Sequence, residues 1–421
     1  MSTEHPEISI HDSKREGDEI IETIGNSEAV ISEIIDSNEY KYSYDLLEDD
    51  DDDLIAIDGY DLSSTNDKLR LDNLSDYIIS DSIGQGSFGS VVKAKLKPYD
   101  DLKTPEAQEL FKMFEIEIKK RNDGNVRYEK YMKDNPDKKY EIYKNEDEND
   151  YCVAIKIMKE KKGKKEKGVT QDELIKEFNL RHILKKDCGM YLVCYYDAFV
   201  KEKEEENKLI LIMSLVTGKH LFYISKDEYY PYKETKESYS DDDKKNITRQ
   251  LFSAVITLHS HNIVHRDIKP ANIIYDKEKQ YTTLIDYGFS CAMPKIEVQD
   301  YVKRCSDIIT GIGTPIYIDP RIFQKSDKSK KSNLDILKKS DLYSLGLVLF
   351  DLWIESVEVN LIRNRVTREE LITPLKTEAI LYQLDLSYKD VKIKNLIRML
   401  INGDENIDGI LKSYNGYVFE S

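Results

Sequence analysis

The sequence predicts an α+β protein in which strands come first and helices follow. Between residues 77 and 216, short runs rich in Ile and Val are bounded by glycines and polar residues, as is typical of strands. From residue 244 onward, most of the chain has a helical pattern of apolar residues. Strands grouped ahead of helices are typical of the α+β class, and 421 residues are enough to bury a large core.

The negative charge is confined to the amino-terminal segment. Residues 1–75 contain 22 acidic and 5 basic residues, which leaves 58 of each sign in residues 76–421 and accounts for the net charge of −17. The consecutive acidic residues Glu48–Asp53 repel one another and stay solvated. We therefore expect residues 1–75 to be a largely disordered tail, or else an acidic docking or autoinhibitory arm. The balanced remainder favours neither nucleic acid nor an anionic membrane as a partner.

The cysteines and the apolar runs indicate an intracellular protein. The cysteines form no Cys-x-x-Cys pair, so we interpret them as free thiols that serve packing in a reducing compartment. No amino-terminal run suits a signal peptide, and the most apolar stretch, 342–353, is far shorter than the roughly 20 residues of a membrane span. We expect a cytoplasmic location and no membrane contact. The cysteines are Cys152, Cys188, Cys194, Cys291 and Cys305.

A glycine-rich hairpin opens the strand region. The strand pattern at 77–83 runs into glycines at positions 84, 86 and 89, and a second strand pattern covers 91–94. Glycines let the backbone approach phosphate groups closely, so a hairpin of this kind can lie over a nucleotide. A dinucleotide-binding site would instead require a helix directly after the glycines, and a strand pattern follows here.

One short span holds the residues of a phosphoryl-transfer site. The segment His265–Asn272 reads His-Arg-Asp-Ile-Lys-Pro-Ala-Asn, and Asp286 begins an Asp-Tyr-Gly turn soon after it. Asp267 is placed to accept a proton from an attacking hydroxyl, and Lys269 to neutralise a transferring phosphoryl group. Asn272 and Asp286 are placed to hold Mg²⁺ against the phosphates of a nucleotide.

These motifs resemble those of the eukaryotic-type serine/threonine protein kinases. The glycine hairpin, a Val-Ala-Ile-Lys strand ending at Lys156, the catalytic loop and the Asp-Tyr-Gly turn occur in the family's order within residues 77–415. The resemblance implies a bilobal protein-kinase fold over residues 76–415, with ATP and Mg²⁺ in the cleft. The β-rich N-lobe would span 76–213, and the helical C-lobe would span 218–415.

The resemblance also assigns the nucleotide-binding residues. It makes the Asp and Lys of the catalytic loop the catalytic pair, and its Asn and the Asp of the following turn the metal ligands. Glu177 is the carboxylate that we expect to orient Lys156, with Glu173 one turn earlier as the rival. The residues expected to contact ATP are Ile83, Gly84, Gln85, Gly86, Ser87, Phe88, Gly89, Val91, Lys156, Glu177, Met213 and Leu215.

Compared with the family, residues 98–149 form an insertion before the strand that carries Lys156. Thr104 is a favourable helix N-cap, and Pro105 suits the first helical position. The predicted helix has an apolar face, which packs either on its own lobe or on a partner protein. That face consists of Leu110, Phe111, Phe114 and Ile118.

The resemblance makes the chain after Gly288 an activation segment. Gly313-Thr314-Pro315 matches the family's substrate-docking turn, in which the Thr hydroxyl bonds the catalytic Asp and Lys. Ser306 and Thr310 are the candidate phosphorylation sites, and Arg266 is placed to pair with a phosphate there. Asp341 matches the residue that anchors the backbone of the catalytic loop.

The chain departs from the family in the metal-binding turn, in the motif after the docking turn, and at Arg181, where the family usually has an apolar residue. Tyr287 replaces Phe in the metal-binding turn, a change that we expect to be tolerated. Residues 319–321 read Asp-Pro-Arg instead of Ala-Pro-Glu, whose Glu forms a buried ion pair with an Arg in the family. We predict a swapped pair of Arg321 with Asp408, because reversing both charges preserves the attraction. His265 is interpreted as a packing residue of the core, with an acid or base role as the alternative.

The sequence therefore predicts a serine/threonine protein kinase that uses ATP and Mg²⁺. The alternative is a pseudokinase that acts as a binding or scaffold protein, and its signature would be the loss of a catalytic or metal-binding residue. None of these residues is lost. The expected partners are protein substrates with a Ser or Thr acceptor, and the insertion 98–149 offers a surface for a further partner.

Overall fold

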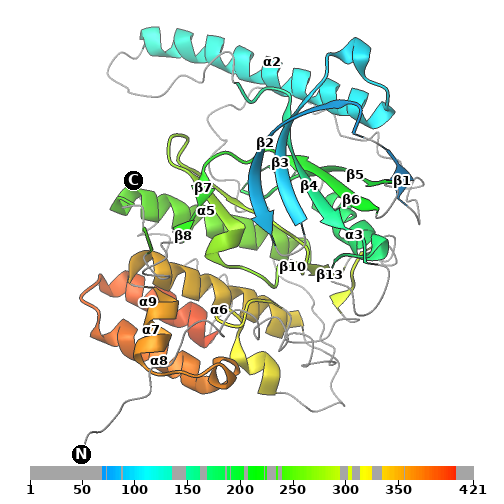
Figure 1. Ribbon diagram of the computed structural model, residues 1–421. Coiled ribbons are helices and arrows are strands. Elements are labelled where there is room, and N and C mark those ends of the chain that lie inside the picture. The colour runs from blue at the N-terminus through cyan, green and yellow to red at the C-terminus, as the bar shows by residue number, and fades with distance from the viewer. Residues whose placement is uncertain are drawn as a thin grey trace, which may run out of the picture. The chain divides into compact units, whose positions relative to one another are not determined.

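The structure is a computed structural model, and it divides between Thr217 and Gly218 into two compact units. The unit that ends at Thr217 contains the strands of the large sheet, and we call it the N-terminal unit. The unit that begins at Gly218 contains most of the helices, and we call it the C-terminal unit (Figure 1). The predicted α+β class is confirmed. The described residues are 69–72, 74–86, 89–134, 148–161, 168–184, 187–189, 191–202, 207–221, 223–224, 234–235, 239–293, 302–305, 313–324, 334–354 and 356–403.

Several sequence predictions lie outside these ranges. The acidic segment is described only from residue 69, where Arg70–Leu71 forms the short strand β1. The phosphorylation candidates Ser306 and Thr310 are not among the described residues, and neither is Asp408. Ser87 and Phe88, at the tip of the glycine hairpin, also lie outside them.

The N-terminal unit is built on a six-stranded sheet with the strand order β1-β5-β6-β4-β3-β2. Neighbouring strands are antiparallel except β1, which runs parallel to β5 at the edge. There, Arg70 donates two hydrogen bonds to Asp197, at 2.5 and 2.6 Å. The other strands are β2 (Tyr77–Gly86), β3 (Gly89–Leu96), β4 (Cys152–Lys159), β5 (Tyr195–Lys201) and β6 (Lys208–Ser214).

The register of the sheet separates its two faces. Lys156 pairs with Val91 on β3, and Ala154 pairs with Met213 on β6. Because side chains alternate along a strand, these residues share one face. Val153, Ile155, Ile210 and Ile212 point to the other face, where they are fully buried in an apolar core.

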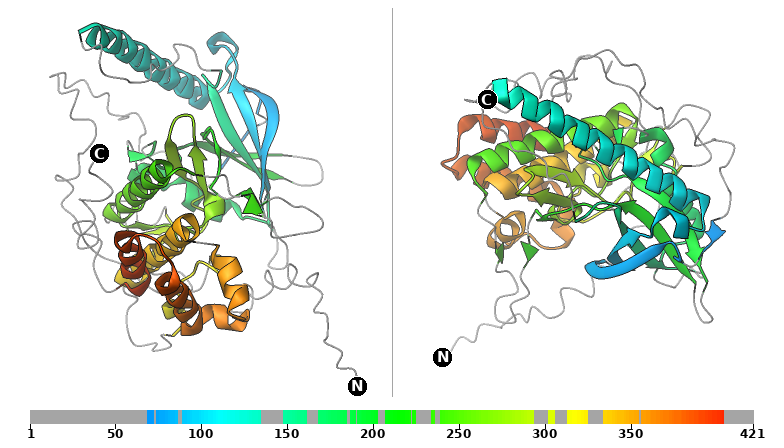
Figure 2. Two further views of the ribbon diagram at one scale, coloured as in Figure 1. Left: turned by 90° about the vertical axis from the view of Figure 1, so that its left-hand side faces the viewer. Right: turned by 90° about the horizontal axis from the view of Figure 1, so that it is seen from above.

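The insertion helix α2 (Pro105–Asp134) covers that second face. Figure 1 shows α2 along the upper side of the sheet, and the two turned views in Figure 2 agree. The predicted start is confirmed, since Thr104 Oγ1 accepts a hydrogen bond from Ala107 N at 3.3 Å. Leu110 and Phe114 are buried in the same core as the strands. The first turns of the helix therefore pack on their own unit, which decides between the two alternatives for this part of the face.

Short helices complete the N-terminal unit. α3 (Gln171–Phe178) begins with a capping box in which Thr170 and Glu173 bond each other's backbone N–H groups. α3 packs against β5 and β6. The 3₁₀ helix η4 (Tyr99–Asp101) precedes α2, and α4 (Arg181–Leu184) follows α3.

The C-terminal unit is built around α6 (Leu334–Trp353), whose last three turns are almost entirely buried. It packs against α5, α7 and α9 (Figure 1). Even so, none of the helices in the described ranges is both long and apolar enough to cross a membrane. The other helices are α5 (Asp241–Ser260), α7 (Val357–Arg363), α8 (Pro374–Leu386), α9 (Val391–Asn402), η6 (Pro270–Asn272), η9 (Pro320–Gln324) and η10 (Glu369–Ile372).

Three small sheets join the helices of the C-terminal unit. The one that positions the candidate site is the β11–β12 hairpin, with β7 on its other edge. β10 pairs with β13, and β8 pairs with β9. Their bounds are β7 (Lys219–His220), β8 (Tyr223–Ile224), β9 (Glu234–Thr235), β10 (Ile263–Val264), β11 (Ile273–Asp276), β12 (Tyr281–Leu284) and β13 (Cys291–Ala292).

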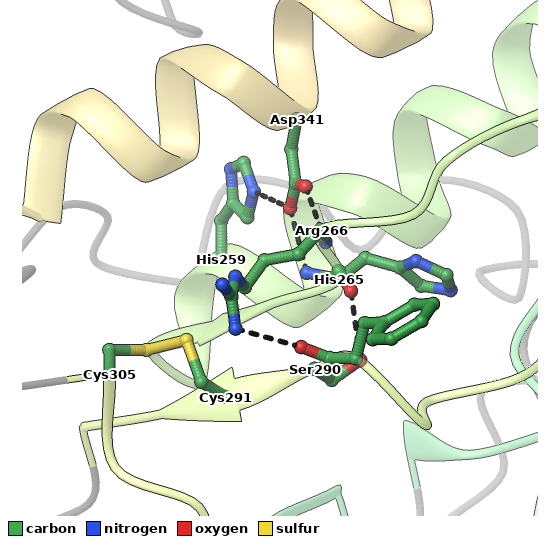
Figure 3. Close-up of a disulfide and its surroundings, with 8 residues drawn as sticks. His259, His265, Arg266, Ser290, Cys291, Cys305 and Asp341 are labelled. Carbon is green, nitrogen blue, oxygen red and sulfur yellow. Dashed lines mark hydrogen bonds and ion pairs between the residues drawn. A yellow bond between two sulfur atoms is a disulfide. The ribbon is translucent and has the colours of Figure 1, made fainter. Parts of the chain in front are cut away.

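The prediction of free thiols is wrong for all cysteines except Cys152. Cys188 is bonded to Cys194, and Cys291 to Cys305, with a Cα–Cα distance of 5.0 Å in each pair. The second disulfide lies beside the catalytic loop (Figure 3). Spacing in the sequence did not reveal these pairs, because each depends on how the intervening chain folds back.

The packing of α2 leads to a stability prediction. Phe114 is 9% exposed and its ring meets Tyr151 edge-on, whereas Ile116 on the same helix is 38% exposed. We expect Phe114→Ala to lower the free energy of unfolding of the N-terminal unit by about 3 kcal/mol. Ile116→Ala is the control and should cost under about 1 kcal/mol. Denaturant-dependent hydrogen exchange of the β4 amides measures both, and equal effects would contradict the packing of α2 on the sheet.

The disulfide beside the catalytic loop leads to a second prediction. Cys291 and Cys305 are 14 residues apart in the sequence. Closing a loop of this length stabilises a protein by about 3 kcal/mol, so Cys291→Ser/Cys305→Ser should lower the free energy of unfolding of the C-terminal unit by that amount. Trp353, the single tryptophan, lies in α6 and reports this transition by fluorescence. Cys188→Ser/Cys194→Ser, in the other unit, is the matched control. Alkylation of five thiols in the unfolded, unreduced protein would refute both disulfides.

Candidate active site

The catalytic loop is held by a buried carboxylate on α6. Asp341 accepts hydrogen bonds from the backbone N–H groups of His265 and Arg266, both at 2.8 Å. His259 Nε2 lies 3.0 Å from the same carboxylate (Figure 3). Arg266 has a φ of 69°, a left-handed conformation that is unfavourable for this residue type and persists only where surrounding contacts hold it. The predicted anchoring of the loop by Asp341 is confirmed.

Asp267 lies at the centre of a hydrogen-bond network. Its Oδ1 accepts from the N–H and the hydroxyl of Thr314, at 3.1 and 2.8 Å. Its Oδ2 accepts from Asn272 Nδ2 at 2.9 Å and lies 2.7 Å from Lys269 Nζ. Lys269 Nζ also donates to the Thr314 hydroxyl at 2.8 Å. The side chain of Asp267 is therefore fixed through both of its oxygens, and the residue is buried, with 5% of its surface exposed.

The turn at Gly313 and Thr314 fits closely against the catalytic loop. Gly313 has a φ of 135°, and a Cβ at this position would lie 2.5 Å from the carbonyl oxygen of Arg266. Glycine is therefore required, both for the backbone conformation and for the space. The expected contact of the Thr314 hydroxyl with Asp267 and Lys269 is confirmed.

The two predicted metal ligands meet at the open end of the β11–β12 hairpin. Asn272 precedes β11 and Asp286 follows β12, and the intervening Ile285 N donates to Asn272 O at 2.9 Å. Asn272 Nδ2 donates to the backbone oxygen and to Oδ2 of Asp267, so the amide oxygen takes part in neither bond. An amide oxygen and a carboxylate are ligands that suit Mg²⁺, which is typically completed by phosphates and water. The residues present thus fit this ion.

No larger metal-binding cluster competes with this pair in the described part of the chain, where no group of three or more His, Cys, Asp or Glu side chains gathers. Asp286 has a φ of 68°, and its carboxylate accepts from Gly288 N at 3.3 Å. The bent backbone and this bond set the direction of the carboxylate.

Lys156 and Glu177 form the candidate phosphate-binding pair of the N-terminal unit. Lys156 Nζ lies 4.0 Å from Glu177 Oε1, and the same oxygen accepts from the Tyr195 hydroxyl at 2.7 Å. Glu173, the rival, is occupied in the capping box at the start of α3. Sequence reasoning missed Tyr195, because only the packing of α3 on β5 brings it to Glu177.

The glycine hairpin lies on β2 and β3, beside the strand that carries Lys156. A Cβ at Gly89 on β3 would lie 1.9 Å from the carbonyl oxygen of Ile157 on β4. These two strands therefore approach at a distance that only glycine permits. Val91 lies on the same face as Lys156, and Met213, the next-to-last residue of β6, lies on that face too. Of the other predicted ATP contacts, Ile83, Gly84, Gln85 and Gly86 lie on β2, and Leu215 directly follows β6.

His265 and Tyr287 are packed in the interior behind the catalytic loop. His265 is fully buried, and its ring meets Tyr287 edge-on with the ring centroids 5.9 Å apart. Its Nε2 lies 3.2 Å from Ile285 O, and its Nδ1 lies 3.3 Å from Asp267 N. Tyr287 is also buried, and burial raises the pKa of its hydroxyl. The contacts of His265 are those of a packing residue, as the sequence indicated.

The side chain of Arg266 extends from the catalytic loop towards the side on which the Cys291–Cys305 disulfide lies (Figure 3). Its side chain is buried, and its Nη1 donates to Phe289 O at 3.2 Å. Burial lowers the pKa of Arg266 to about 10, against the opposing effect of Asp341. At neutral pH the guanidinium therefore remains charged.

Arg321 caps the carboxyl end of α9. Its Nη2 donates to Ile401 O at 3.0 Å, and its Nη1 donates to Asn402 O. Its Nε donates to both carboxylate oxygens of Asp319 at 2.9 Å. The last carbonyls of a helix have no partner within the helix, so a cation is favourable there. The predicted partner, Asp408, lies outside the described residues.

Comparison with known proteins gives one family match. Residues 140–406 match the family model described as "Protein kinase domain". The match begins within the insertion 98–149 and therefore leaves out the glycine hairpin. In the structure the hairpin pairs with β4, inside the matched region.

Curated relatives match a shorter part of the chain. The phosphorylase b kinase gamma catalytic chain, liver/testis isoform, of Mus musculus is 31% identical over 172 residues, which cover 41% of this chain and 36% of the relative. CBL-interacting serine/threonine-protein kinase 5 of Arabidopsis thaliana is 27% identical over 202 residues, covering 47% and 38%. Myosin light chain kinase A of Dictyostelium discoideum is 31% identical over 191 residues, covering 44% and 55%. The chain thus spans about a third to a half of the length of these relatives.

Proposed function

Because this chain belongs to the protein kinase family, we propose that it transfers the γ-phosphoryl group of ATP to serine and threonine hydroxyls of proteins. The observation that carries the proposal is the network of Asp267, Lys269 and Thr314. It holds a carboxylate and an ammonium group side by side, as the transfer to an alcohol requires. Protein kinases in general use ATP and Mg²⁺, and we extend both to this chain.

In the proposed reaction, the acceptor hydroxyl donates a hydrogen bond to Asp267, which directs its oxygen at the γ-phosphorus. The new P–O bond forms as the bond to the β,γ-bridging oxygen breaks, and the hydroxyl proton passes to Asp267. Lys269 offsets the negative charge of the transferring group. Mg²⁺, when bound, neutralises the phosphates of the nucleotide, and Asn272 and Asp286 would hold it. Catalysis then consists mainly of positioning and charge neutralisation.

The nucleotide is bound by the residues of the N-terminal unit in this proposal. The hairpin glycines bring backbone N–H groups to the phosphates, and Lys156 contacts them under the control of Glu177. The buried bond from Tyr195 keeps Glu177 in one orientation. Met213 and Leu215 flank the adenine. A pseudokinase has no specific observation in its favour, because the lysine, the catalytic carboxylate and both metal ligands are present.

The contact of Lys269 with Thr314 supports a preference for serine and threonine. The resemblance to protein kinases links this pair to Ser/Thr substrates, and one of the relatives carries serine/threonine in its name. The identity of the protein substrate is not part of the proposal.

The proposed function is tested by transfer of radiolabelled phosphate from Mg-ATP to casein, an acidic acceptor, and to histone, a basic one. Asp267→Asn keeps the size of the side chain but cannot accept the proton, so we expect labelling to fall by a factor of about 10² to 10⁴. Acid hydrolysis should give phosphoserine or phosphothreonine. If neither the wild type nor Asp267→Asn labels an acceptor while both bind ATP, the kinase proposal fails and a pseudokinase is favoured.

The two glutamates of α3 provide a matched pair of variants. Glu177→Gln removes the charge that orients Lys156, so we expect kcat/KM for ATP to fall by about tenfold to a hundredfold. Glu173→Gln alters only the cap of the same helix and should change kcat/KM by less than about twofold. Steady-state kinetics at saturating acceptor measures both. Equal losses in the two variants would mean that Glu177 has no special role.

A further inference from the structure

A buried lysine binds the chain directly after the predicted substrate-docking turn. Lys376 lies in the first turn of α8 and its side chain is 0% exposed. Its Nζ donates to Pro315 O at 3.0 Å, to Ile316 O at 3.2 Å, and to Ile318 O. These residues follow Thr314, the residue that bonds Asp267 and Lys269. The proposed reaction gives this lysine no role.

The number of donors on Lys376 matches the number of carbonyls that converge on it. The N–H groups of Tyr317 and Ile318 both donate to Thr314 O, at 2.8 and 3.1 Å, and close a tight turn. The carbonyls of residues 315, 316 and 318 take no part in that turn. A lysine ammonium carries three N–H donors and no acceptor, so one side chain satisfies all three carbonyls. A buried carbonyl left without a donor would be destabilising.

The lysine is itself fixed by its surroundings. Its Nζ lies 5.3 Å from the centre of the Tyr343 ring on α6, a favourable cation–π distance. The Tyr343 hydroxyl lies 2.9 Å from Thr377 Oγ1, next to the lysine on α8. On the other side of the turn, Ser344 Oγ donates to Tyr317 O at 2.8 Å, and the Tyr317 hydroxyl donates to Asp351 at 2.7 Å. The segment 315–318 is thus held from α6 through Tyr317 and from α8 through Lys376.

We propose that Lys376 is a positioning residue for the protein acceptor: it fixes the segment 315–318, and through it the contact of Thr314 with Asp267. This inference rests on the proposed kinase function and deepens it. Arg321 stands where the resemblance to protein kinases places an ion-pairing Glu, and it bonds the last carbonyls of α9 and the carboxylate of Asp319. In this chain the anchoring of the docking turn therefore falls to Lys376.

The ionisation of Lys376 predicts how the stability of the turn depends on pH. Burial lowers the pKa of Lys376 to about 7, and Asp319 acts in the opposite direction. The groups around the ammonium are Asp319, directly after the segment 315–318, Tyr343 on α6, and Arg321, whose guanidinium also lies over the Tyr343 ring. Below this pKa the ammonium satisfies three carbonyls, and above it the neutral amine has two N–H donors. Because burial lowers this pKa below the usual value of 10.5, the closed turn favours the neutral amine relative to a solvated lysine, and opening the turn takes up a proton above about pH 7. The turn should therefore open less readily as pH rises above about 7.

The kinetic test compares Lys376→Met with Lys394→Met. Lys394, on α9, also donates to two backbone carbonyls, those of Asp385 and Ser387, but it is not buried and lies outside the docking turn. We expect Lys376→Met to raise KM for the protein acceptor, casein or histone, by about tenfold and to leave KM for ATP within about twofold. Lys394→Met should change neither. In the wild type and in Lys394→Met, KM for the acceptor should fall between pH 7 and 8.5, and in Lys376→Met it should stay constant over this range.

A second measurement requires neither turnover nor a variant that folds. Hydrogen exchange of the Tyr317 and Ile318 amides, which donate to Thr314 O, should slow in the wild-type chain as pH rises above about 7 relative to the amides of α6, after correction for intrinsic rates. An active wild type whose acceptor KM is the same in Lys376→Met would overturn the proposal, as would a pH-independent protection of these amides. If the wild type transfers no phosphate, the kinase proposal fails, and the exchange experiment still decides whether Lys376 holds the turn.

Discussion

The carboxylate of Asp341 is the contact on which the whole catalytic network depends. By accepting the N–H groups of His265 and Arg266, it holds Arg266 in a left-handed conformation that the chain would otherwise avoid. The carbonyl of Arg266 then lies against Gly313, so the same bend that presents Asp267 also sets the docking turn. A single buried side chain on the central helix thereby aligns two segments that are far apart in the sequence.

Cations bound to backbone carbonyls are a recurrent device in the C-terminal unit. Lys376 binds three carbonyls of the segment after Thr314, and Arg321 binds the last carbonyls of α9. Both sites offer acceptors that secondary structure leaves without a partner, which is where a side chain carrying only donors is most favourable. Lys376 is thus explained by carbonyl groups, and Arg321 by carbonyl groups together with the carboxylate of Asp319.

The N-terminal unit accommodates a long insertion without disturbing its candidate site, because a sheet has two faces. Lys156, Val91 and Met213 share one face, and the apolar side of α2 covers the other. The helix therefore adds to the core of the unit from the side away from the lysine. Glu177 approaches the lysine from α3, which is a separate element with its own cap.

The sequence alone determined the local chemistry of this protein. Asp267, Lys269 and Asn272 lie within one loop, where spacing along the chain fixes which side chains can meet. Thr104 likewise predicted the start of α2, because an N-cap contacts a residue only three positions further along the chain. Only the tertiary structure decided the pairing of the cysteines, the bond of Tyr195 to Glu177, and the partners of Arg321 and Lys376. Each of these contacts joins residues whose approach depends on how helices and strands pack, and a pattern read along the chain carries no record of that packing.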